Sequence, residues 1–227
     1  MRRFQTILFD LYDTLIWLDV QESNRWRQRF AQRLAVPIDA FFSVWRRSVN
    51  DRMLGKVGDL SNQITTAVSE LGISPNAALI EELVAIERQR LEQSVKLYPN
   101  TVKVLERLAA NGYRLGLLSN ASDGAAIPIT RLGIDKLFHQ MILSHEVGLL
   151  KPDPAIYHLA CQRLQSAPSE TVFVADGGFG ELDAAKDLGI YTVLIEQDNQ
   201  SKDYGSSTRY DIKIGDIQEI ENILDLS

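Results

Sequence analysis

The heptapeptide FDLYDTL, Phe9–Leu15, follows directly from a short apolar run, Ile7–Phe9, that has the character of a buried strand. Asp10 therefore comes at the C-terminal end of a strand, where open α/β sheets place their active sites. A carboxylate there can accept a phosphoryl or alkyl group and later release it to water, so Asp10 is a candidate nucleophile. Tyr12 stands two residues further on, and the next acid, Asp13, comes one position later. Whether the second acid stands at position 12 or at position 13 bears on which reaction the site can catalyse.

The composition is that of an ordinary globular protein. The chain has 227 residues, of which 45% are hydrophobic and 24% charged, enough for a core domain with a smaller insert. It contains no run of 18 apolar residues, so no membrane span is expected. The net charge of −6 argues against nucleic acid as the main partner. Cys161 is the only cysteine, which excludes an internal disulfide and favours a reducing cytoplasm. Its helical surroundings predict a buried thiol.

The segment from about Val20 to Ser94 shows no strand-like alternation. Its apolar periodicity predicts four amphipathic helices. These are expected at Asn24–Ala35, around Phe41–Trp45, at Leu60–Leu71 and at Ala77–Leu91. We therefore expect a helical cap domain over residues 19–94, inserted into a core domain made of residues 1–18 and 95–227.

After Tyr98-Pro99 strands and helices alternate. Strands are predicted at 114–118, 140–143, 171–175, 191–195 and 211–214, and the main helices at 100–111, 153–164, 181–188 and 217–226. The polar stretch Glu196–Arg209 is expected to be a loop. Alternation of this kind predicts an α/β fold: a doubly wound, Rossmann-like, mostly parallel sheet covered by helices on both faces.

Polar residues recur just beyond the predicted strands or at the start of a helix. They are Asp10, Ser119, Asn120, Lys151, Asp176 and Glu181. Because the carboxyl ends of the strands border one crevice, we expect these residues to converge there. Each one alone is equally typical of a helix cap, a turn or a solvated loop. Taken together, their positions along the chain indicate a site.

The residue types of this set fit hydrolysis through a covalent aspartyl intermediate. Asp10 would attack, while Ser119 and Asn120 would donate hydrogen bonds to oxygens of the transferred group. Lys151 would supply a fixed positive charge. Asp176 and Glu181 would hold Mg²⁺, a hard cation that prefers oxygen ligands.

These segments resemble the motifs of the haloacid dehalogenase-like superfamily of hydrolases, in particular the members with a helical cap inserted after the first motif. FDLYDTL is similar to the first motif, LGLLSNAS (Leu115–Ser122) to the second, LLKPDPAIY (Leu149–Tyr157) to the third, and Val172–Ile190 to the fourth.

The resemblance implies a role for each matching residue. Asp10 takes the place of the nucleophile, Ser119 that of the oxygen-binding hydroxyl and Lys151 that of the motif lysine. Asp176 and Glu181 fall at the acidic pair, and the backbone carbonyl of residue 12 is a metal contact. The Mg²⁺ ligands implied are therefore Asp10, Tyr12, Asp176 and Glu181.

Two motifs point to different chemistries. Phosphatases of the superfamily carry a second aspartate, which protonates the leaving oxygen, at the position of Tyr12. General acid catalysis is worth about 10²–10⁴-fold. The 2-haloacid dehalogenases carry tyrosine there, but they work without a metal and have Ser-Asn in place of Ala175-Asp176. We weight the acidic pair more, because uncompensated carboxylates beside Asp10 would raise its pKa.

The sequence therefore predicts a Mg²⁺-dependent phosphatase that acts on a small phosphorylated metabolite. The alternatives are a metal-free 2-haloacid dehalogenase and a non-catalytic protein that binds a phosphorylated ligand. Asp13 is a possible substitute acid. The cap arginines Arg25, Arg27 and Arg29 are expected on a solvated surface, and Trp17, Trp26 and Trp45 in the core of the cap. The oligomeric state stays open.

Overall fold

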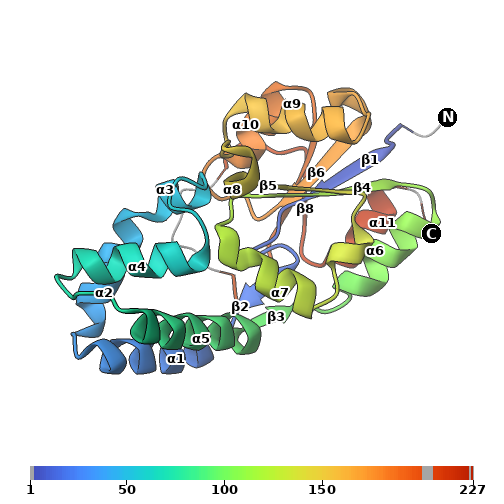
Figure 1. Cartoon of the computed structure of the whole chain (residues 1–227). Helices are drawn as coiled ribbons and strands as arrows, with labels where there is room; N and C mark the ends of the chain where they lie inside the picture. Colours follow the sequence, from blue (N-terminus) through green and yellow to red (C-terminus); the bar gives the residue numbers. More distant parts are fainter. Residues whose placement is uncertain (1–2, 201–206, 225, 227) are drawn as a thin grey trace.

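Six parallel strands form the central sheet of the protein. The computed structural model describes residues 3–200, 207–224 and 226. The strand order is β5-β4-β1-β6-β7-β8 (Figure 1). The strands are β1 (Thr6–Phe9), β4 (Arg114–Ser119), β5 (Gln140–Leu143), β6 (Thr171–Ala175), β7 (Tyr191–Ile195) and β8 (Ile212–Ile214). The predicted α/β, Rossmann-like core is confirmed.

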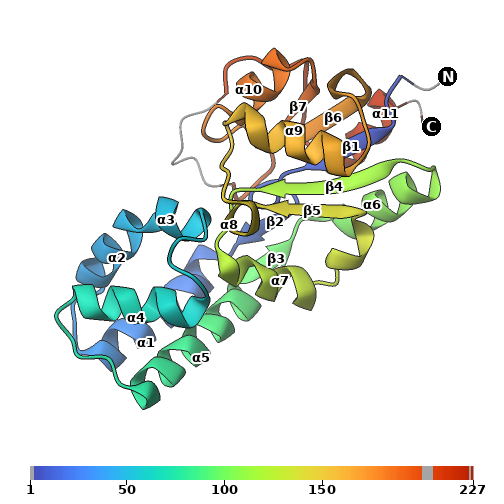
Figure 2. The same cartoon turned by 45° about the horizontal axis from the view of Figure 1, so that its top comes forward.

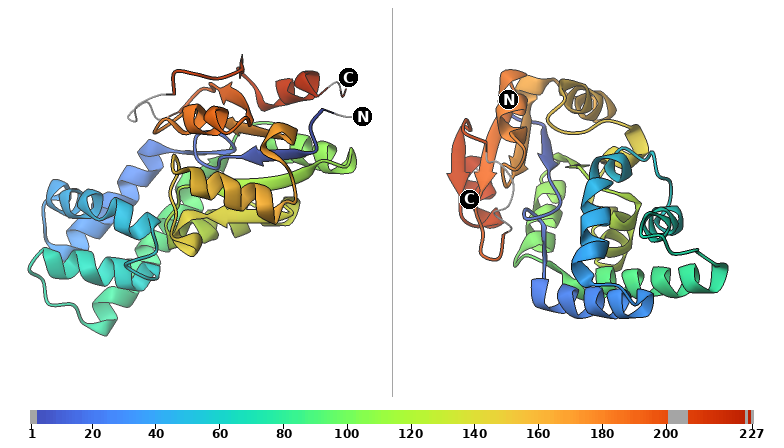
Figure 3. Two further views of the ribbon diagram at one scale, coloured as in Figure 1. Left: turned by 90° about the horizontal axis from the view of Figure 1, so that it is seen from above. Right: turned by 90° about the vertical axis from the view of Figure 1, so that its left-hand side faces the viewer.

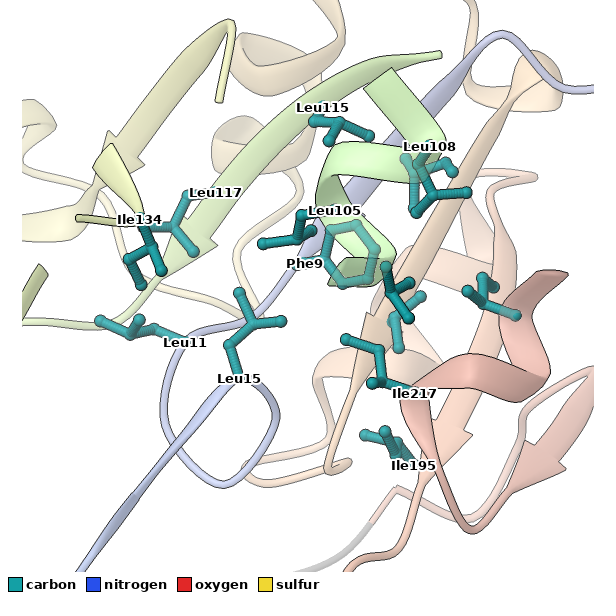
Figure 4. Packing of buried hydrophobic residues seen from close by; sticks show 14 of the residues in the cluster. Phe9, Leu11, Leu15, Leu105, Leu108, Leu115, Leu117, Ile134, Ile195 and Ile217 are labelled. Atoms are coloured by element: carbon teal, nitrogen blue, oxygen red, sulfur yellow. The ribbon is translucent and has the colours of Figure 1, made fainter. Parts of the chain in front are cut away.

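Alternate residues of β1 enter different apolar clusters, because successive side chains of a strand point to opposite faces. Ile7 and Phe9 belong to a cluster with residues of α6 (Thr101–Ala110) and α11 (Ile220–Ile223), part of which is shown in Figure 4. Leu8 belongs to a second cluster. The helices α9 (Pro154–Arg163) and α10 (Glu181–Asp187) cover that face. The sheet is therefore buried on both sides, as its continuous apolar strands require.

Short helices complete the core. They are η1 (Asp123–Ala125), α7 (Ala126–Arg131), η2 (Asp135–Leu137), α8 (Ser144–Val147), η3 (Pro168–Glu170) and η4 (Ile217–Glu219). The helix expected over 217–226 is thus a 3-10 turn followed by the four-residue α11. Of the predicted loop at Glu196–Arg209, residues 201–206 lie outside the described residues.

Five helices of the N-terminal half lie away from the sheet (Figures 1 and 2). They are α1 (Val20–Leu34), α2 (Ile38–Arg47), α3 (Val49–Met53), α4 (Leu60–Glu70) and α5 (Ala77–Ser94). Side chains cap the starts of three of them: Asp19, Asp59 and Asn76 each accept a backbone N–H bond from the first turn. Their apolar faces form a separate cluster around Ile64 and Leu83. Four helices were expected, and α3 is the additional one, set off from α2 at Ser48.

A two-stranded antiparallel ribbon joins these helices to the sheet. It pairs β2 (Ile16–Leu18) with β3 (Val95–Leu97), directly before α1 and directly after α5. The left view in Figure 3 shows the helices at one end of the molecule, beyond the sheet. The sequence did not predict this ribbon, and it takes Trp17 out of the helical segment. The division into a core domain and a cap at residues 18/19 and 94/95 stays a prediction.

Candidate active site

Three of the expected site residues lie at the ends of neighbouring strands. Asp10 directly follows β1, Ser119 ends β4 and Asp176 directly follows β6. Because β1 lies between β4 and β6, these residues meet at one edge of the sheet. The backbone N–H of Asp10 donates to the carbonyl of Val174, 2.9 Å away, which extends the ladder past the end of β1. Asp10 and Ser119 are both buried.

Lys151 connects the carboxylates of this edge. Its Nζ lies 2.5 Å from Oδ1 of Asp10 and 2.5 Å from Oε2 of Glu181. Burial disfavours the charged ammonium, but the two carboxylates outweigh burial and raise the pKa of Lys151. The lysine is therefore a permanent positive charge that holds Asp10 in place.

Asn120 fixes Lys151 through its backbone. The Asn120 side-chain amide donates to the Lys151 carbonyl, and its Oδ1 accepts from the Lys151 N–H, each over 2.8 Å. The structure thus gives the Asn120 side chain a positioning contact, and its expected donation to substrate oxygens stays a prediction. The loop after β4 thereby places the lysine opposite Asp10.

The carboxylates of the site outnumber its cations. Ligand oxygens of Asp10, Asp176 and Glu181 all lie within 4.8 Å of one another. Three carboxylates and the single ammonium of Lys151 leave a formal charge of −2 when all are ionised (−3 + 1). Oε1 of Glu181 is buried and has no hydrogen-bond partner among the described residues. A buried oxygen without a partner, next to two further carboxylates, fits a hard divalent cation such as Mg²⁺.

The electrostatics of the acidic pair agree with that fit. Burial raises the pKa of Glu181 to about 8, and Lys151 opposes this while Asp10 and Asp176 reinforce it. Burial and the charge of Asp10 also raise the pKa of Asp176. In the absence of a cation, burial and the neighbouring charges thus disfavour ionisation of Asp176 and Glu181. A bound cation would relieve the repulsion.

Tyr12 is a half-buried side chain that packs against the main apolar cluster. Burial raises its pKa to about 12, Arg90 of α5 opposes the rise, and Asp10 adds to it. A phenol with so high a pKa is a poor proton donor at neutral pH. The position that carries the acid in phosphatases therefore holds a weak acid here.

Asp13, the possible substitute acid, lies in a tight turn with a positive φ of 56°. Burial raises the pKa of Tyr98, and the charges of Asp13 and Asp176 add to the rise. Asp13 and Asp176 are therefore both near Tyr98. The loop after β6 also contains residues with positive φ, 85° at Gly177 and 72° at Gly180, a conformation that glycine adopts readily.

Two buried polar residues escaped the sequence analysis, and one of them, Tyr157, contacts a residue of the site. The Tyr157 hydroxyl donates to the backbone carbonyl of Glu181 over 2.9 Å and so positions the start of α10. Thr14 is buried, and its Oγ1 has no hydrogen-bond partner among the described residues. Tyr157 lies in an apolar helix pattern, where an aromatic residue is typical of core packing. Its position six residues after Lys151 was the only signal in the sequence that could have indicated a role in the site.

The structure agrees with some of the other expectations about single residues and differs from others. Cys161 is buried as predicted. Arg25 and Arg29 are exposed, the first paired with Glu22 and the second over the ring of Trp26. Arg27 is only half-exposed, lies over the Phe42 ring and lines a pocket of the helical segment. Trp26 is buried, whereas Trp45 lines the same pocket.

In the part of the chain that the structure describes, no helix has the length and apolar character needed to cross a membrane.

Comparisons with known proteins place the chain among hydrolases. It is 28% identical over 212 residues to (S)-2-haloacid dehalogenase 1 of Pseudomonas sp. (strain CBS-3), covering 90% of this chain and 89% of that protein. It is also 26% identical over 226 residues to the glyceraldehyde 3-phosphate phosphatase of Methanocaldococcus jannaschii, covering 96% of both. Sequence similarity thus extends to both chemistries.

Solved structures share the fold at lower identity. The 2-haloacid dehalogenase from Pseudomonas syringae pv. Tomato DC3000 has a TM-score of 0.74 at 21% identity, with 98% of this chain and 99% of that chain covered. The HAD phosphatase from Thermococcus onnurineus has a TM-score of 0.69 at 21% identity, covering 97% and 98%. The profile of the haloacid dehalogenase-like hydrolases matches residues 4–189. The chain belongs to the haloacid dehalogenase-like hydrolases.

Proposed function

We propose that the protein is a Mg²⁺-dependent phosphatase that hydrolyses a small phosphorylated metabolite through Asp10. One observation carries this choice: three neighbouring carboxylates, those of buried Asp10 and Glu181 and of half-buried Asp176, lie beside a single ammonium, and one oxygen of Glu181 has no partner among the described residues. A metal-free reaction would leave this excess negative charge beside the nucleophile without compensation.

In this mechanism Asp10 attacks phosphorus with a carboxylate oxygen. The bond from phosphorus to the leaving oxygen breaks, the electron pair leaves with that oxygen, and an aspartyl phosphate remains. Lys151 binds Oδ1 of Asp10 and orients the carboxylate for attack. The Ser119 hydroxyl, at the end of β4, donates to an oxygen of the transferred group. Water then attacks phosphorus, which releases phosphate and restores Asp10.

Asp10, the Tyr12 carbonyl, Asp176 and Glu181 would hold the metal. When bound, Mg²⁺ supplies positive charge to the oxygens of the phosphoryl group and screens Asp10 from the acidic pair. Residues 19–94 would act as the cap that excludes water from the crevice.

Tyr12 restricts the substrates on this proposal. Its raised pKa makes it a poor replacement for an aspartic acid as proton donor. Leaving groups that depart without a proton, such as carboxylates and acidic phenols, should therefore react faster than alkoxides.

A second candidate function is metal-free 2-haloacid dehalogenation. Tyr12 and the similarity to (S)-2-haloacid dehalogenase 1 favour it. In that reaction Asp10 would displace halide from carbon and form an ester, which water then cleaves. A third possibility, a non-catalytic protein that binds phosphorylated ligands, would follow from the missing acid.

A substrate panel measured with Mg²⁺ and with excess chelator separates the three functions. The proposal predicts phosphate release from acyl and aryl phosphates, lost in chelator, and no halide release from 2-chloropropionate. Halide release in chelator would establish the dehalogenase instead. Phosphate binding without turnover of any compound would support the non-catalytic function.

A further inference from the structure

The two acids of the proposed cation site stand at the two ends of one short loop. Asp176 directly follows β6, Glu181 begins α10, and residues 177–180 lie between them. Three of these four residues have positive φ, and one of the three is Phe179, at 57°. A bulky side chain rarely adopts this backbone conformation, so the surrounding structure must hold the loop in place.

The start of α10 is capped from outside its own segment. Gly180 occupies the N-cap position and has no side chain that could accept a hydrogen bond from the first turn. The N–H of Leu182 instead donates to Oγ of Ser207 over 3.0 Å. Ser207 lies 25 residues further along the chain, in the connection between β7 and β8. A distant hydroxyl therefore caps the helix that begins with Glu181.

Ser207 also binds the other end of the loop. Its backbone N–H donates to the carbonyl of Gly177, the residue after Asp176, over 2.6 Å. The two segments pack closely, because a Cβ on Gly177 would lie 3.5 Å from Cβ of Ser207 and 3.0 Å from Cδ1 of Leu194. Ser207 is buried, with an exposed fraction of 7%. A single residue thus joins the chain next to Asp176 to the chain next to Glu181.

The separation of the two acids matters for the cation that they would hold. Mg²⁺ requires oxygen ligands at about 2.0–2.1 Å in near-ideal octahedral geometry, whereas Ca²⁺ accepts about 2.3–2.6 Å and a less regular arrangement. Oxygens of Asp10, Asp176 and Glu181 lie within 4.8 Å of one another, so a small shift of the loop would change the fit to Mg²⁺. Residues that orient metal ligands through hydrogen bonds typically contribute roughly 10- to 100-fold to metal affinity.

We infer that Ser207 is a positioning residue for the proposed Mg²⁺ site, because its hydroxyl and its N–H hold Asp176 and Glu181 at the separation that Mg²⁺ requires. The inference deepens the proposed function and rests on it. Ser207 acts through Gly177 and Leu182 and does not itself bind the cation. It gives the connection between β7 and β8, which contains none of the expected site residues, a role in the choice of cation.

Calorimetry on the full chain tests this without turnover. We would measure the affinities for Mg²⁺ and for Ca²⁺ in the wild type and in Ser207→Ala. The substitution removes the acceptor of the Leu182 N–H and keeps the backbone bond to Gly177. The affinity for Mg²⁺ should fall roughly 10- to 100-fold. The affinity for Ca²⁺ should fall less, because Ca²⁺ tolerates a looser arrangement, so the ratio of Mg²⁺ to Ca²⁺ affinity should decrease.

Two hydroxyl deletions are matched controls. Thr208→Val removes the hydroxyl of the next residue, which donates to Asp183 over 3.4 Å and not to the loop. Thr171→Val removes a buried hydroxyl that donates to the Ala167 carbonyl over 2.9 Å, at the end of β6 opposite to Asp176. It should lower stability to an extent similar to Ser207→Ala, since each substitution removes one buried hydrogen bond. Both controls should keep the wild-type affinities, and thermal unfolding in chelator measures the stability of each variant.

A Ser207→Ala variant that binds Mg²⁺ as tightly as the wild type would overturn the inference. So would an equal loss of affinity for both ions, or the same loss in Thr171→Val, because either would show a general effect of stability. Failure of the proposed function looks different. The wild type would then bind no Mg²⁺ and would release no phosphate in the substrate panel, and the inference would fail with the function.

Discussion

The sheet side of the molecule, with the candidate active site, and the helical side differ in how their charges are paired. On the sheet side, Asp10, Asp176 and Glu181 outnumber Lys151 and leave a formal −2. On the helical side, Arg90 pairs with Glu87, and Arg52 is buried with no ion pair among the described residues. The sheet side therefore calls for a cation.

The two sides are also held differently. The sheet-side residues follow buried parallel strands that are hydrogen-bonded to each other. The chain passes between the helical segment and the core through the ribbon of β2 and β3, three residues per strand, and the helical segment also contacts the core through the bond from the Leu60 N–H to Oδ2 of Asp123, 3.0 Å long. A short ribbon is a suitable hinge, because few backbone dihedral angles need to change when one part moves against the other.

The largest expected effect is the loss of the nucleophile on the sheet side. Asp10→Asn keeps the shape and removes the reactive carboxylate, so kcat should fall roughly 10⁴-fold or more. Phosphate release, with circular dichroism as the control for folding, measures this. Retention of more than a few per cent of activity would show that Asp10 is not the nucleophile.

Removal of the metal should have the next largest effect. Excess chelator should abolish turnover, and Asp176→Asn should remove the calorimetric signal of Mg²⁺ binding, because the remaining carboxylates no longer form the full donor set. Asp183→Asn, in the same helix as Glu181 but engaged with the backbone of Thr208 and Arg209, is the control. Full activity in chelator would favour the dehalogenase.

Replacement of Tyr12 should sharpen the contrast between good and poor leaving groups. For the wild type, kcat/KM should fall steeply as the pKa of the leaving group rises. Tyr12→Asp should raise the rates of alkyl phosphates by up to about 10²–10⁴-fold, the value of general acid catalysis, if its carboxyl reaches the leaving oxygen. A wild type that hydrolyses alkyl and aryl phosphates equally well must have another proton donor, and Asp13→Asn is then the first variant to test.

The smallest effect concerns the hinge. If the helical segment closes over the crevice, a phosphate analogue with Mg²⁺ should slow hydrogen exchange in Ile16–Leu18 and Val95–Leu97 by roughly tenfold at tenfold excess over Kd. Amides at the centre of β4 serve as the internal control. Unchanged exchange in the ribbon, under conditions where the analogue binds, would argue against cap closure.

The sequence predicted the sheet side of this comparison far better than the helical side. Asp10, Ser119 and Asp176 follow apolar runs, and the rule that active sites lie at the carboxyl ends of parallel strands places them at one edge. The ion pairs of Lys151 with Asp10 and Glu181 depend on the same rule. The two hydrogen bonds between Asn120 and Lys151 do not follow from this rule, because they join two loops that are 31 residues apart in the sequence.

No comparable rule predicts the features of the helical side from the sequence. Arg52 looks like any other arginine in a segment rich in them, and its burial follows only from how α3 packs. The ribbon of β2 and β3 is equally hidden, because strands of three residues are too short to show alternation. Tertiary packing decides both features, so the sequence alone predicted neither the buried Arg52 nor the ribbon.

The most direct test of the account is the chemical identity of the group that Asp10 carries during turnover. Acid-quenched reactions with an acyl phosphate in Mg²⁺, and with 2-chloropropionate in chelator, would be digested and analysed by mass spectrometry. The account predicts a phosphoryl group on the peptide that contains Asp10 in the first reaction and an unmodified peptide in the second. An Asp10 ester formed from 2-chloropropionate without metal, with no phosphorylated peptide in the first reaction, would contradict it.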